Sequence, residues 1–191
     1  LYEESFYTIC EALVNSGLSE NLIIGTTTNG TIYNTRLKSL IPKFKEFHLG
    51  ISIESVTQLN DYIRYPSKWT DIEKNLRLLD ATPDNIVINI ACAVQLLNVL
   101  YLPELAKWKI ESKFKKVNLA PFGGGLIGLH MVYLPSYLNV KVLPNHIKNL
   151  AKERIEEYLL ENQSMDFTVG PTGRQRWQGI IKYMMSEDWS D

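Results

Sequence analysis

Hydrophobic residues recur along the chain with two different periods, and the period changes several times. Apolar positions three and four residues apart predict a helix over 2–15, and the same spacing returns at 35–42, 70–80, 102–109 and after Pro144. Short stretches rich in β-branched residues separate these segments, at 22–28, 47–53, 85–97 and 117–120. The pattern therefore predicts four strands that alternate with helices.

Capping signals predict where three of the helices begin. Thr35 is expected to cap the second helix, and Pro42 to limit its length. Thr70 opens a Thr-Asp-Ile-Glu sequence with the spacing of a capping box. Asn145 is expected to cap the last long helix, directly after Pro144.

The same periods assign buried and solvated positions. Cys10 falls on the apolar stripe of the first helix and Cys92 falls in the apolar run at 85–97, so both are expected in the core. That run is long and apolar enough to predict a strand covered on both faces. Lys109 is expected on the solvated side of its helix, and Leu150 on the inward face of the last long helix.

Strands that alternate with helices predict parallel βα units joined by right-handed crossovers, which is an α/β fold. Four strands are few for a closed barrel, so we expect an incomplete barrel or a small open sheet with the helices outside. In either architecture the ligand site lies beyond the carboxyl ends of the strands, near 28–30, 52–55, 95–98 and the loop after Ala120. The strand at 22–28 would form an unpaired edge, which favours homo-oligomers.

Charge and composition argue against several kinds of partner. The chain has 20 basic and 21 acidic residues, so its net charge of −1 creates no overall attraction to nucleic acid or to an anionic membrane. Arg174, Arg176 and Trp177 form a small basic and aromatic group, for which a loop contact is the expected role. No apolar run approaches the roughly 20 residues that span a bilayer. We therefore expect a cytoplasmic chain that binds neither nucleic acid nor membrane.

Short motifs follow one another along the chain in a fixed order, and several of them lie at the expected strand ends. They are Thr-Thr-Asn-Gly at 27–30, Gly-Ile-Ser-Ile-Glu-Ser at 50–55, Asp-Tyr-Ile-Arg-Tyr at 61–65, Asn98 and the pair Leu143-Pro144. In order and spacing the set resembles the radical S-adenosylmethionine (radical SAM) enzymes, in particular the branch with a reduced auxiliary, or twitch, extension. The resemblance implies an incomplete (β/α)6 barrel. Residues 1–162 would hold its strands three to six, and 163–191 the start of the extension.

The resemblance also implies which residues bind S-adenosylmethionine. These are Ser52, Glu54, Arg64, Asn29, Asn98 and Leu143. Ser52, Glu54 and Arg64 match the positions that hold the ribose and the carboxylate, and a guanidinium suits a carboxylate well. Asn29 is better suited to shape its turn, because asparagine tolerates positive φ. From the residues alone a structural role stays open, since Ser52 can satisfy backbone groups and Glu54 can pair with Arg64.

The reaction of this family needs ligands that the sequence lacks. Three cysteines, usually spaced Cys-x3-Cys-x2-Cys, hold a [4Fe-4S] cluster in the family, whereas this chain has only Cys10 and Cys92. The Gly-Gly-Glu-Pro turn of the family is also missing. We therefore expect a fragment that begins after these segments and ends within the extension, inactive by itself and with neither cluster nor S-adenosylmethionine bound.

Two functions follow. In the first, the parent protein cleaves S-adenosylmethionine reductively and uses the 5′-deoxyadenosyl radical to abstract hydrogen from a small-molecule or peptide substrate. In the second, the chain is a non-catalytic remnant of the fold that acts as a binding or interaction domain. In either case no catalytic residue and no metal ligand is assigned within the chain.

Overall fold

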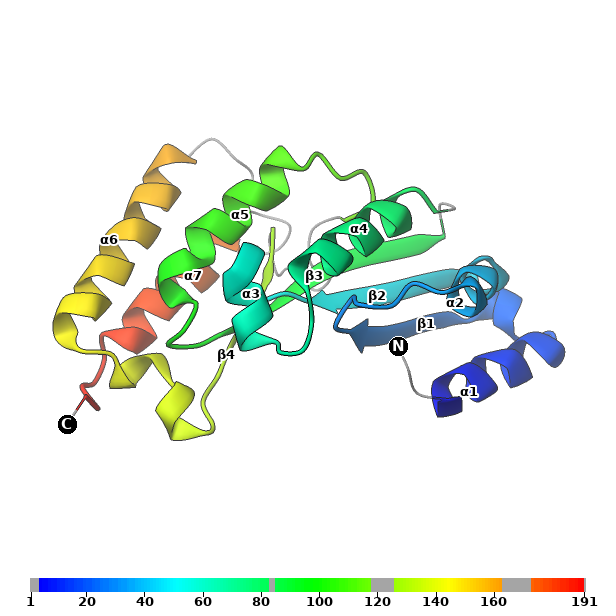
Figure 1. Ribbon diagram of the computed structural model, residues 1–191, viewed down its shortest axis with the longest axis horizontal. Coiled ribbons are helices and arrows are strands. Elements are labelled where there is room, and N and C mark those ends of the chain that lie inside the picture. Colours follow the sequence, from blue (N-terminus) through cyan, green and yellow to red (C-terminus); the bar gives the residue numbers. More distant parts are fainter. Residues whose placement is uncertain (1–3, 83–84, 118–125, 163–172, 191) are drawn as a thin grey trace.

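Four parallel strands form one sheet at the centre of the chain (Figure 1). The computed structural model describes residues 4–82, 85–117, 126–162 and 173–190. The strands are β1 (Ile23–Thr28), β2 (Glu46–Ser52), β3 (Ile86–Val94) and β4 (Gly128–Met131). They pair in the order β1-β2-β3-β4, and every pairing is parallel. The predicted α/β class with parallel strands is confirmed.

Helices connect the strands and flank the sheet. Between β1 and β2 lies α2 (Thr35–Leu40), between β2 and β3 lie α3 (Thr57–Ile63) and α4 (Trp69–Asp80), and between β3 and β4 lies α5 (Leu102–Glu111). The described chain begins with α1 (Glu4–Asn15) and continues after β4 with α6 (Asn145–Glu161) and α7 (Gly173–Met184). The helices that the hydrophobic spacing predicts are therefore all present.

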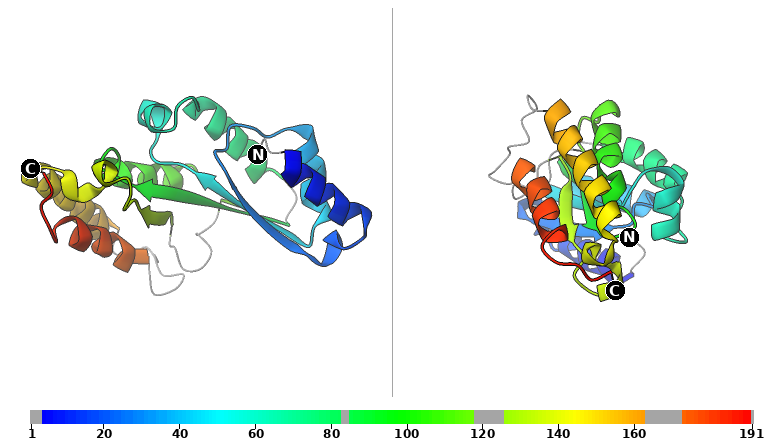
Figure 2. Two further views of the ribbon diagram at one scale, coloured as in Figure 1. Left: turned by 90° about the horizontal axis from the view of Figure 1, so that it is seen from below. Right: turned by 90° about the vertical axis from the view of Figure 1, so that its left-hand side faces the viewer.

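The sheet is wound in one direction. Each strand lies beside the one before it, so the strand order never reverses as it does in doubly wound sheets. A right-handed crossover between neighbouring parallel strands places each connecting helix on the same face. Accordingly, α2, α4 and α5 lie on one side of the sheet, whereas α7 lies on the other side near β4 (Figure 2).

The fourth strand lies later in the chain than the hydrophobic pattern predicts. Val117 makes an isolated parallel bridge to Ile88, and residues 118–120 lie outside the described residues. The strand that completes the sheet is β4, which pairs with residues 91–94 of β3. It is only 4 residues long, too short for its own period to reveal it. Its pairing with β3 defines it.

One face of the sheet carries the hydrophobic core. Apolar side chains from alternate positions of β2 and β3 are buried there beneath the connecting helices, and α1 adds Phe6, whose ring lies 6.4 Å from that of Phe47. We call this the covered face. Its central residues are Phe47, Leu49, Ile51, Ile88, Ile90 and Cys92.

The opposite face is polar and less buried. Because side chains alternate along a strand, the residues between those of the covered face point the other way. We call this the open face, and it includes Thr27, His48, Ser52, Asn89 and Ala91, which are exposed or half-buried. The expectation that the strand at 85–97 is covered on both faces is therefore wrong, since burial alternates along β3.

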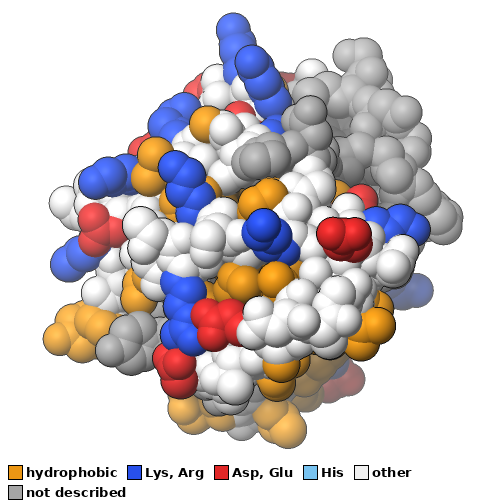
Figure 3. All heavy atoms as spheres, turned by 90° about the vertical axis from the view of Figure 1, so that its right-hand side faces the viewer, with side chains coloured by type: hydrophobic (Ala, Val, Ile, Leu, Met, Phe, Trp, Pro, Cys, Tyr) orange, Lys and Arg blue, Asp and Glu red, His pale blue; other side chains and the backbone are white. Residues whose placement is uncertain are grey.

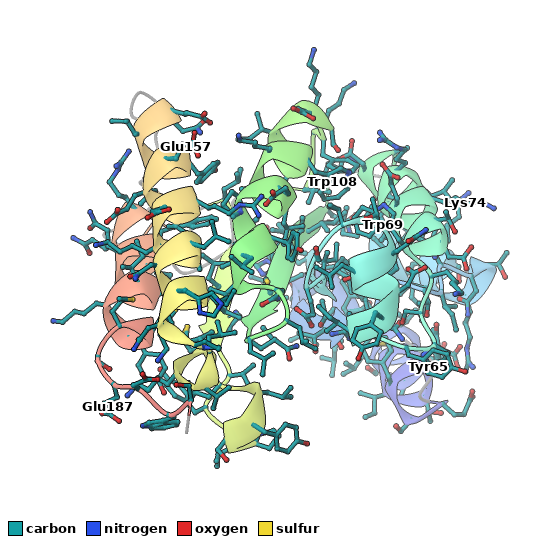
Figure 4. The ribbon with its side chains drawn as sticks, turned by 60° about the vertical axis from the view of Figure 1, so that its left-hand side comes forward. Tyr65, Trp69, Lys74, Trp108, Glu157 and Glu187 are labelled. Atoms are coloured by element: carbon teal, nitrogen blue, oxygen red, sulfur yellow. The ribbon has the colours of Figure 1, made fainter. Side chains whose placement is uncertain are left out.

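An aromatic cluster joins α4 to α5 above the covered face. The rings of Trp69 and Trp108 meet edge to face with centroids 4.9 Å apart, and Phe114 packs against Trp108 at 5.7 Å (Figure 4). The indole N–H of Trp108 donates a hydrogen bond of 3.4 Å to Glu73. These rings fix the spacing of the two helices.

Lys109 is buried in α5, contrary to the solvated position expected for it. Its ammonium group donates a hydrogen bond to the Leu126 carbonyl. Desolvation lowers the pKa of Lys109 to about 8. Lysine is treated as polar when helix faces are assigned from the sequence. Its long apolar stem can nevertheless lie within a core if the amine donates to an acceptor there.

The cap of α2 is Asn34 rather than Thr35. The helix starts at Thr35 itself, and the Asn34 side chain accepts a hydrogen bond of 2.9 Å from the Leu37 N–H. Both residue types are good caps. Asn34 is the cap because its backbone is extended, whereas Thr35 is already the first residue of the helix.

The prediction of a capping box at Thr70 is also wrong. The helix α4 begins one residue earlier, and the N–H of Trp69 donates to the Asp61 carboxylate of α3 at 2.5 Å. The cap is therefore a tertiary contact, which ties α3 to the start of α4.

The end of the described chain is fastened to α6. Asn145 is the first residue of this helix and does not cap it; its side-chain amide donates to Asp188 at 2.7 Å. Lys148 is buried and donates to the same carboxylate at 2.9 Å. Leu150, expected on the inward face, is exposed. Lys148 lies on the inward face instead, since Asp188 provides an acceptor for its buried amine.

A second lysine strengthens this attachment. The Lys141 ammonium lies 3.1 Å from Glu187 and 4.9 Å from the centre of the Trp189 ring. We call the two ion pairs, Lys141 with Glu187 and Lys148 with Asp188, the C-terminal latch.

Arg174, Arg176 and Trp177 lie in α7, and their contacts are with α6 and β4 rather than the expected contact with a loop. Trp177 is buried, with its ring centroid 4.9 Å from that of Tyr158 in α6. Arg174 donates to the Leu159 carbonyl at 2.7 Å. The basic and aromatic group therefore anchors α7 to α6.

The outer surface has no dominant character on the side of α1. Basic, acidic and hydrophobic side chains are interspersed there (Figure 3). Among the described residues, none of the helices combines the length and the apolar composition needed to cross a membrane.

Candidate functional site at the strand ends

A buried carboxylate lies just beyond the end of β2. Glu54 is only 3% exposed. One carboxylate oxygen accepts a hydrogen bond of 2.5 Å from Nη1 of Arg64, and the other accepts one of 2.8 Å from the N–H of Ala93 in β3. A buried charge is costly unless it is paired and hydrogen-bonded. Here both oxygens accept hydrogen bonds from protein groups.

Asn98 joins the ends of β2 and β3. It is fully buried, and its amide nitrogen donates to the carbonyls of Glu54 at 2.9 Å and Ala93 at 3.0 Å. Its amide oxygen accepts a hydrogen bond of 2.8 Å from the N–H of Gln95. The side chain of Asn98 thus provides the backbone groups at the ends of β2 and β3 with hydrogen-bond partners where the pairing between the strands stops.

Asn60 anchors α3 to the same point. Its side-chain oxygen accepts hydrogen bonds from the N–H groups of Glu54 at 3.0 Å and Ser55 at 3.3 Å. Sequence reasoning missed this residue. The available signal was an amide at the position between Val56 and Ile63 where the inner stripe of the short helix calls for an apolar residue. We call Glu54, Asn60, Arg64 and Asn98 the strand-end network.

Arg64 is the member of the network that reaches solvent. It follows the last residue of α3, and its side chain is 25% exposed, against 4% for that of Glu54. Its Nε–H is buried and has no acceptor among the described residues. The guanidinium therefore has donor capacity beyond its bond to Glu54.

The other expected binding residues lie apart from the network. Ser52 is the last residue of β2 on the open face, half-buried, with no side-chain hydrogen bond among the described residues. Leu143 is a buried core residue between the short helical turn Val140–Val142 and α6. The structure thus brings Glu54, Arg64 and Asn98 into one set of hydrogen bonds and leaves Ser52 and Leu143 outside it.

Asn29 shapes the turn after β1, but not through positive φ. The positive φ, 74°, belongs to Gly30, where a Cβ would lie 2.9 Å from a methyl carbon of Ile51. Asn29 instead accepts hydrogen bonds from the N–H and the hydroxyl of Thr31, at 3.2 and 2.8 Å. Asn75 of α4 then fixes the turn by donating to the Gly30 carbonyl at 2.9 Å.

A pocket of about 350 Å³ opens beside the network. Its wall includes Ser55 and Val56, which follow Glu54 directly, and Tyr101 of the turn after Asn98. Thr57, also in the wall, has a φ of 59°, which is unusual for a β-branched residue. The chain therefore turns sharply from the network into α3.

The cysteines do not suit an iron-sulfur cluster. Cys10 in α1 and Cys92 in β3 are both fully buried in the core, and burial raises the pKa of each thiol. Among residues 4–82, 85–117, 126–162 and 173–190, no three His, Cys, Asp or Glu side chains are grouped so that they could hold a metal ion.

No protein-family model matches the sequence, and no curated protein matches it significantly. The arrangement of the side chains is therefore the main guide to function. It offers a guanidinium held at the carboxyl ends of the strands and, at the end of β2 on the polar face of the sheet, a hydroxyl that has no hydrogen-bond partner among the described residues.

Proposed function

We propose that this chain forms the S-adenosylmethionine-binding part of a radical SAM-type incomplete barrel. The observation that carries the proposal is the position of Arg64, held by a buried carboxylate at the carboxyl ends of a singly wound parallel sheet whose other face is open and polar. Ligands of α/β sheets bind at this end. The motifs that resemble the family, at 27–30, 50–55 and 98, also follow the ends of successive strands.

Arg64 is the residue proposed to bind the ligand carboxylate. A guanidinium binds a carboxylate through charge-assisted hydrogen bonds, and the side chain of Arg64 is partly exposed and has donor groups besides the Nη1 that is bonded to Glu54. Ser52 would offer its hydroxyl, which has no partner among the described residues, to the ribose from the end of β2.

Glu54 takes a different role from the one that the resemblance implies. Both of its oxygens already accept hydrogen bonds from the protein. In this proposal it is a positioning residue that orients Arg64, and the contact with the ribose falls to Ser52.

S-adenosylmethionine supplies a sulfonium whose bond to the 5′-carbon is broken, in the radical SAM reaction, by an electron from an iron-sulfur cluster. The described residues contribute to binding and orientation. Cluster ligands would have to come from residues other than Cys10 and Cys92, which lie in the core.

A non-catalytic binding domain is the second candidate. The observation in its favour is that Glu54 and Asn98 are satisfied entirely by protein groups, as a purely structural network requires. In that case Arg64 only stabilises Glu54, and its removal would lower stability without altering the affinity for S-adenosylmethionine.

Calorimetric titration of the full chain with S-adenosylmethionine tests the proposal. The sequence alone leads us to expect no bound ligand in this chain, whereas the proposal expects binding, because Arg64 is held at the strand ends and is partly exposed. In Arg64→Gln we expect affinity to fall by about 1.5 to 3 kcal/mol, the range for a hydrogen bond to a charged group. Because this variant leaves Glu54 buried without its cation, the double variant Arg64→Gln with Glu54→Gln should be measured as well. Arg77→Gln, which removes an exposed arginine of α4, is the matched control.

The outcomes separate the two candidates. Loss of affinity in both Arg64 variants, with Arg77→Gln unchanged, supports binding of the ligand by Arg64. No measurable binding to the wild-type chain, or equal affinity in all four proteins, would contradict the proposal.

A further inference from the structure

A second pocket, of about 460 Å³, lies between the end of β4 and α7. His130 of β4 lies on one side and Arg176 of α7 on the other. His130 is paired in register with Ala93 of β3, whose side chain points away from the covered face, so the pocket is on the open side of the sheet. None of the strand-end network residues lines it.

The charge of this pocket is not neutralised by the described residues. The described residues that line it include no aspartate or glutamate. Arg176 makes one long hydrogen bond, 3.4 Å, to the Leu129 carbonyl, and no ion pair with any described residue. His130 is exposed and makes no hydrogen bond within the described part of the chain. A guanidinium and an imidazole therefore face one cavity with their donors available.

Gly179 of α7 lines the pocket without contributing a side chain. Gly179 lies in the interior of α7, where glycine is less favourable than alanine because of its backbone entropy. A Cβ at this position would meet nothing within 4 Å. Packing among the described residues therefore gives no reason for the glycine, whereas a ligand lying across the helix would.

One wall of the pocket is rigid before any ligand binds. The Tyr183 hydroxyl is held at 2.8 Å by the side-chain amide of the buried Asn139. Its ring meets that of Tyr133 edge to face at 5.3 Å, and the Lys141 ammonium lies 4.5 Å from its centre. A preorganised aromatic wall lowers the entropic cost of binding a flat or apolar group.

We propose that this pocket binds a small organic anion. Its carboxylate or phosphate would lie between Arg176 and His130, and its aromatic or aliphatic body would lie over Gly179 against Tyr133 and Tyr183. Charge-assisted hydrogen bonds from a guanidinium supply the specificity for the anionic group. The inference is independent of the function proposed above, because it uses none of the residues assigned to S-adenosylmethionine.

The test is a titration of the full chain with phenyl phosphate, benzoate and the neutral analogue benzyl alcohol, followed by the NMR signals of the His130 ring and the Gly179 amide. At least one of the two anions should give saturable shifts, and benzyl alcohol should bind at least tenfold more weakly. Arg176→Gln should weaken anion binding at least tenfold. Lys182→Gln, which removes an exposed cation from the same helix outside the pocket, should leave the affinity within twofold.

Two variants of Gly179 check the position of the ligand without risking the fold. Gly179→Ala and Gly179→Leu both favour the helix, but only leucine should fill the pocket and abolish the shifts of His130. Arg64→Gln should leave anion affinity unchanged. Absence of saturable binding by either anion, equal losses in Arg176→Gln and Lys182→Gln, or undiminished binding in Gly179→Leu would overturn the proposal.

Discussion

The covered and open faces of the sheet come from the same strands, yet they differ in what they contribute. The covered face is continuous hydrocarbon beneath helices, so each side chain there gains free energy from burial. The open face alternates with it residue by residue but carries small and polar groups such as Thr27, Ser52 and Ala91. Side-chain alternation thus places the residues that stabilise the fold on one face and Ser52, proposed to bind the ligand, on the other. Changes on the two faces should have different consequences.

The largest effect is expected from a cavity in the covered face. Ile90→Ala removes a fully buried side chain at the centre of β3 and should lower the free energy of unfolding by about 2 to 5 kcal/mol. Ser52→Ala on the open face should change it by less than about 0.5 kcal/mol. Urea denaturation measures both values, and similar losses in the two variants would refute the distinction between the faces.

A somewhat smaller loss is expected at the strand ends, where polar groups replace hydrocarbon. Asn98→Leu would leave the carbonyls of Glu54 and Ala93 and the N–H of Gln95 without their partner. The free energy of unfolding should fall by at least about 2 kcal/mol, since an unsatisfied buried polar group costs about 1 to 3 kcal/mol. The control is Asn29→Ala in the exposed turn after β1, with an expected loss below about 1 kcal/mol. A smaller loss in Asn98→Leu than in the control would show that the network is dispensable.

In the turn from the strand-end network into α3, by contrast, a substitution should stabilise the fold. At Thr57 the φ of 59° is unfavourable for a β-branched residue, so Thr57→Gly should raise the free energy of unfolding by about 1 kcal/mol. In the helical backbone of α1, Thr8→Gly should lower it by a few tenths of a kcal/mol. Thermal unfolding of both variants checks that the two changes in stability have opposite signs. Destabilisation in Thr57→Gly would contradict this account of the turn.

The C-terminal latch should show its contribution as a dependence on pH. Lys148 and the backbone and hydroxyl of Ser190 lower the pKa of Asp188 from 3.8 to about 2. A carboxyl whose pKa is lower in the folded state stabilises the fold when it is ionised. The stability difference between wild type and Asp188→Asn should therefore be complete above about pH 5 and disappear as the pH falls from 3.8 through about 2.

The control for the latch is Glu157→Gln on the exposed side of α6 (Figure 4), which removes a carboxylate that has no ion pair among the described residues. It should show no comparable change over this pH range. A difference for Asp188→Asn that persists unchanged at pH 2 would show that the charge of Asp188 is not the source of its contribution.

Hydrophobic periodicity predicted most of the covered face. The features that it did not predict depend on tertiary contacts. The stripes through Cys10 and Ile90 define their elements locally, because the period of two or 3.6 residues survives in the sequence. The start of α4 depends on Asp61, and the burial of Lys148 depends on Asp188, 40 residues away. No local pattern contains such partners.

The strand-end network shows the same limit. Glu54, Arg64 and Asn98 were singled out because short motifs resemble a known family, whereas Asn60, which holds the backbone of Glu54, belongs to none of the motifs. The resemblance also assigned ligand contacts to Glu54. The structure shows that both of its oxygens accept hydrogen bonds from protein groups, and only three-dimensional neighbours such as the N–H of Ala93 could reveal this.

The central claim, that the open face and the strand ends bind S-adenosylmethionine while the covered face stabilises the fold, can be tested by one NMR titration of the full chain. With S-adenosylmethionine added, saturable shifts are expected in the amide signals of Thr27, Ser52 and Arg64, with those of Leu49 and Ile90 little changed. No saturable shift at any concentration, or shifts centred on Leu49 and Ile90, would contradict the claim.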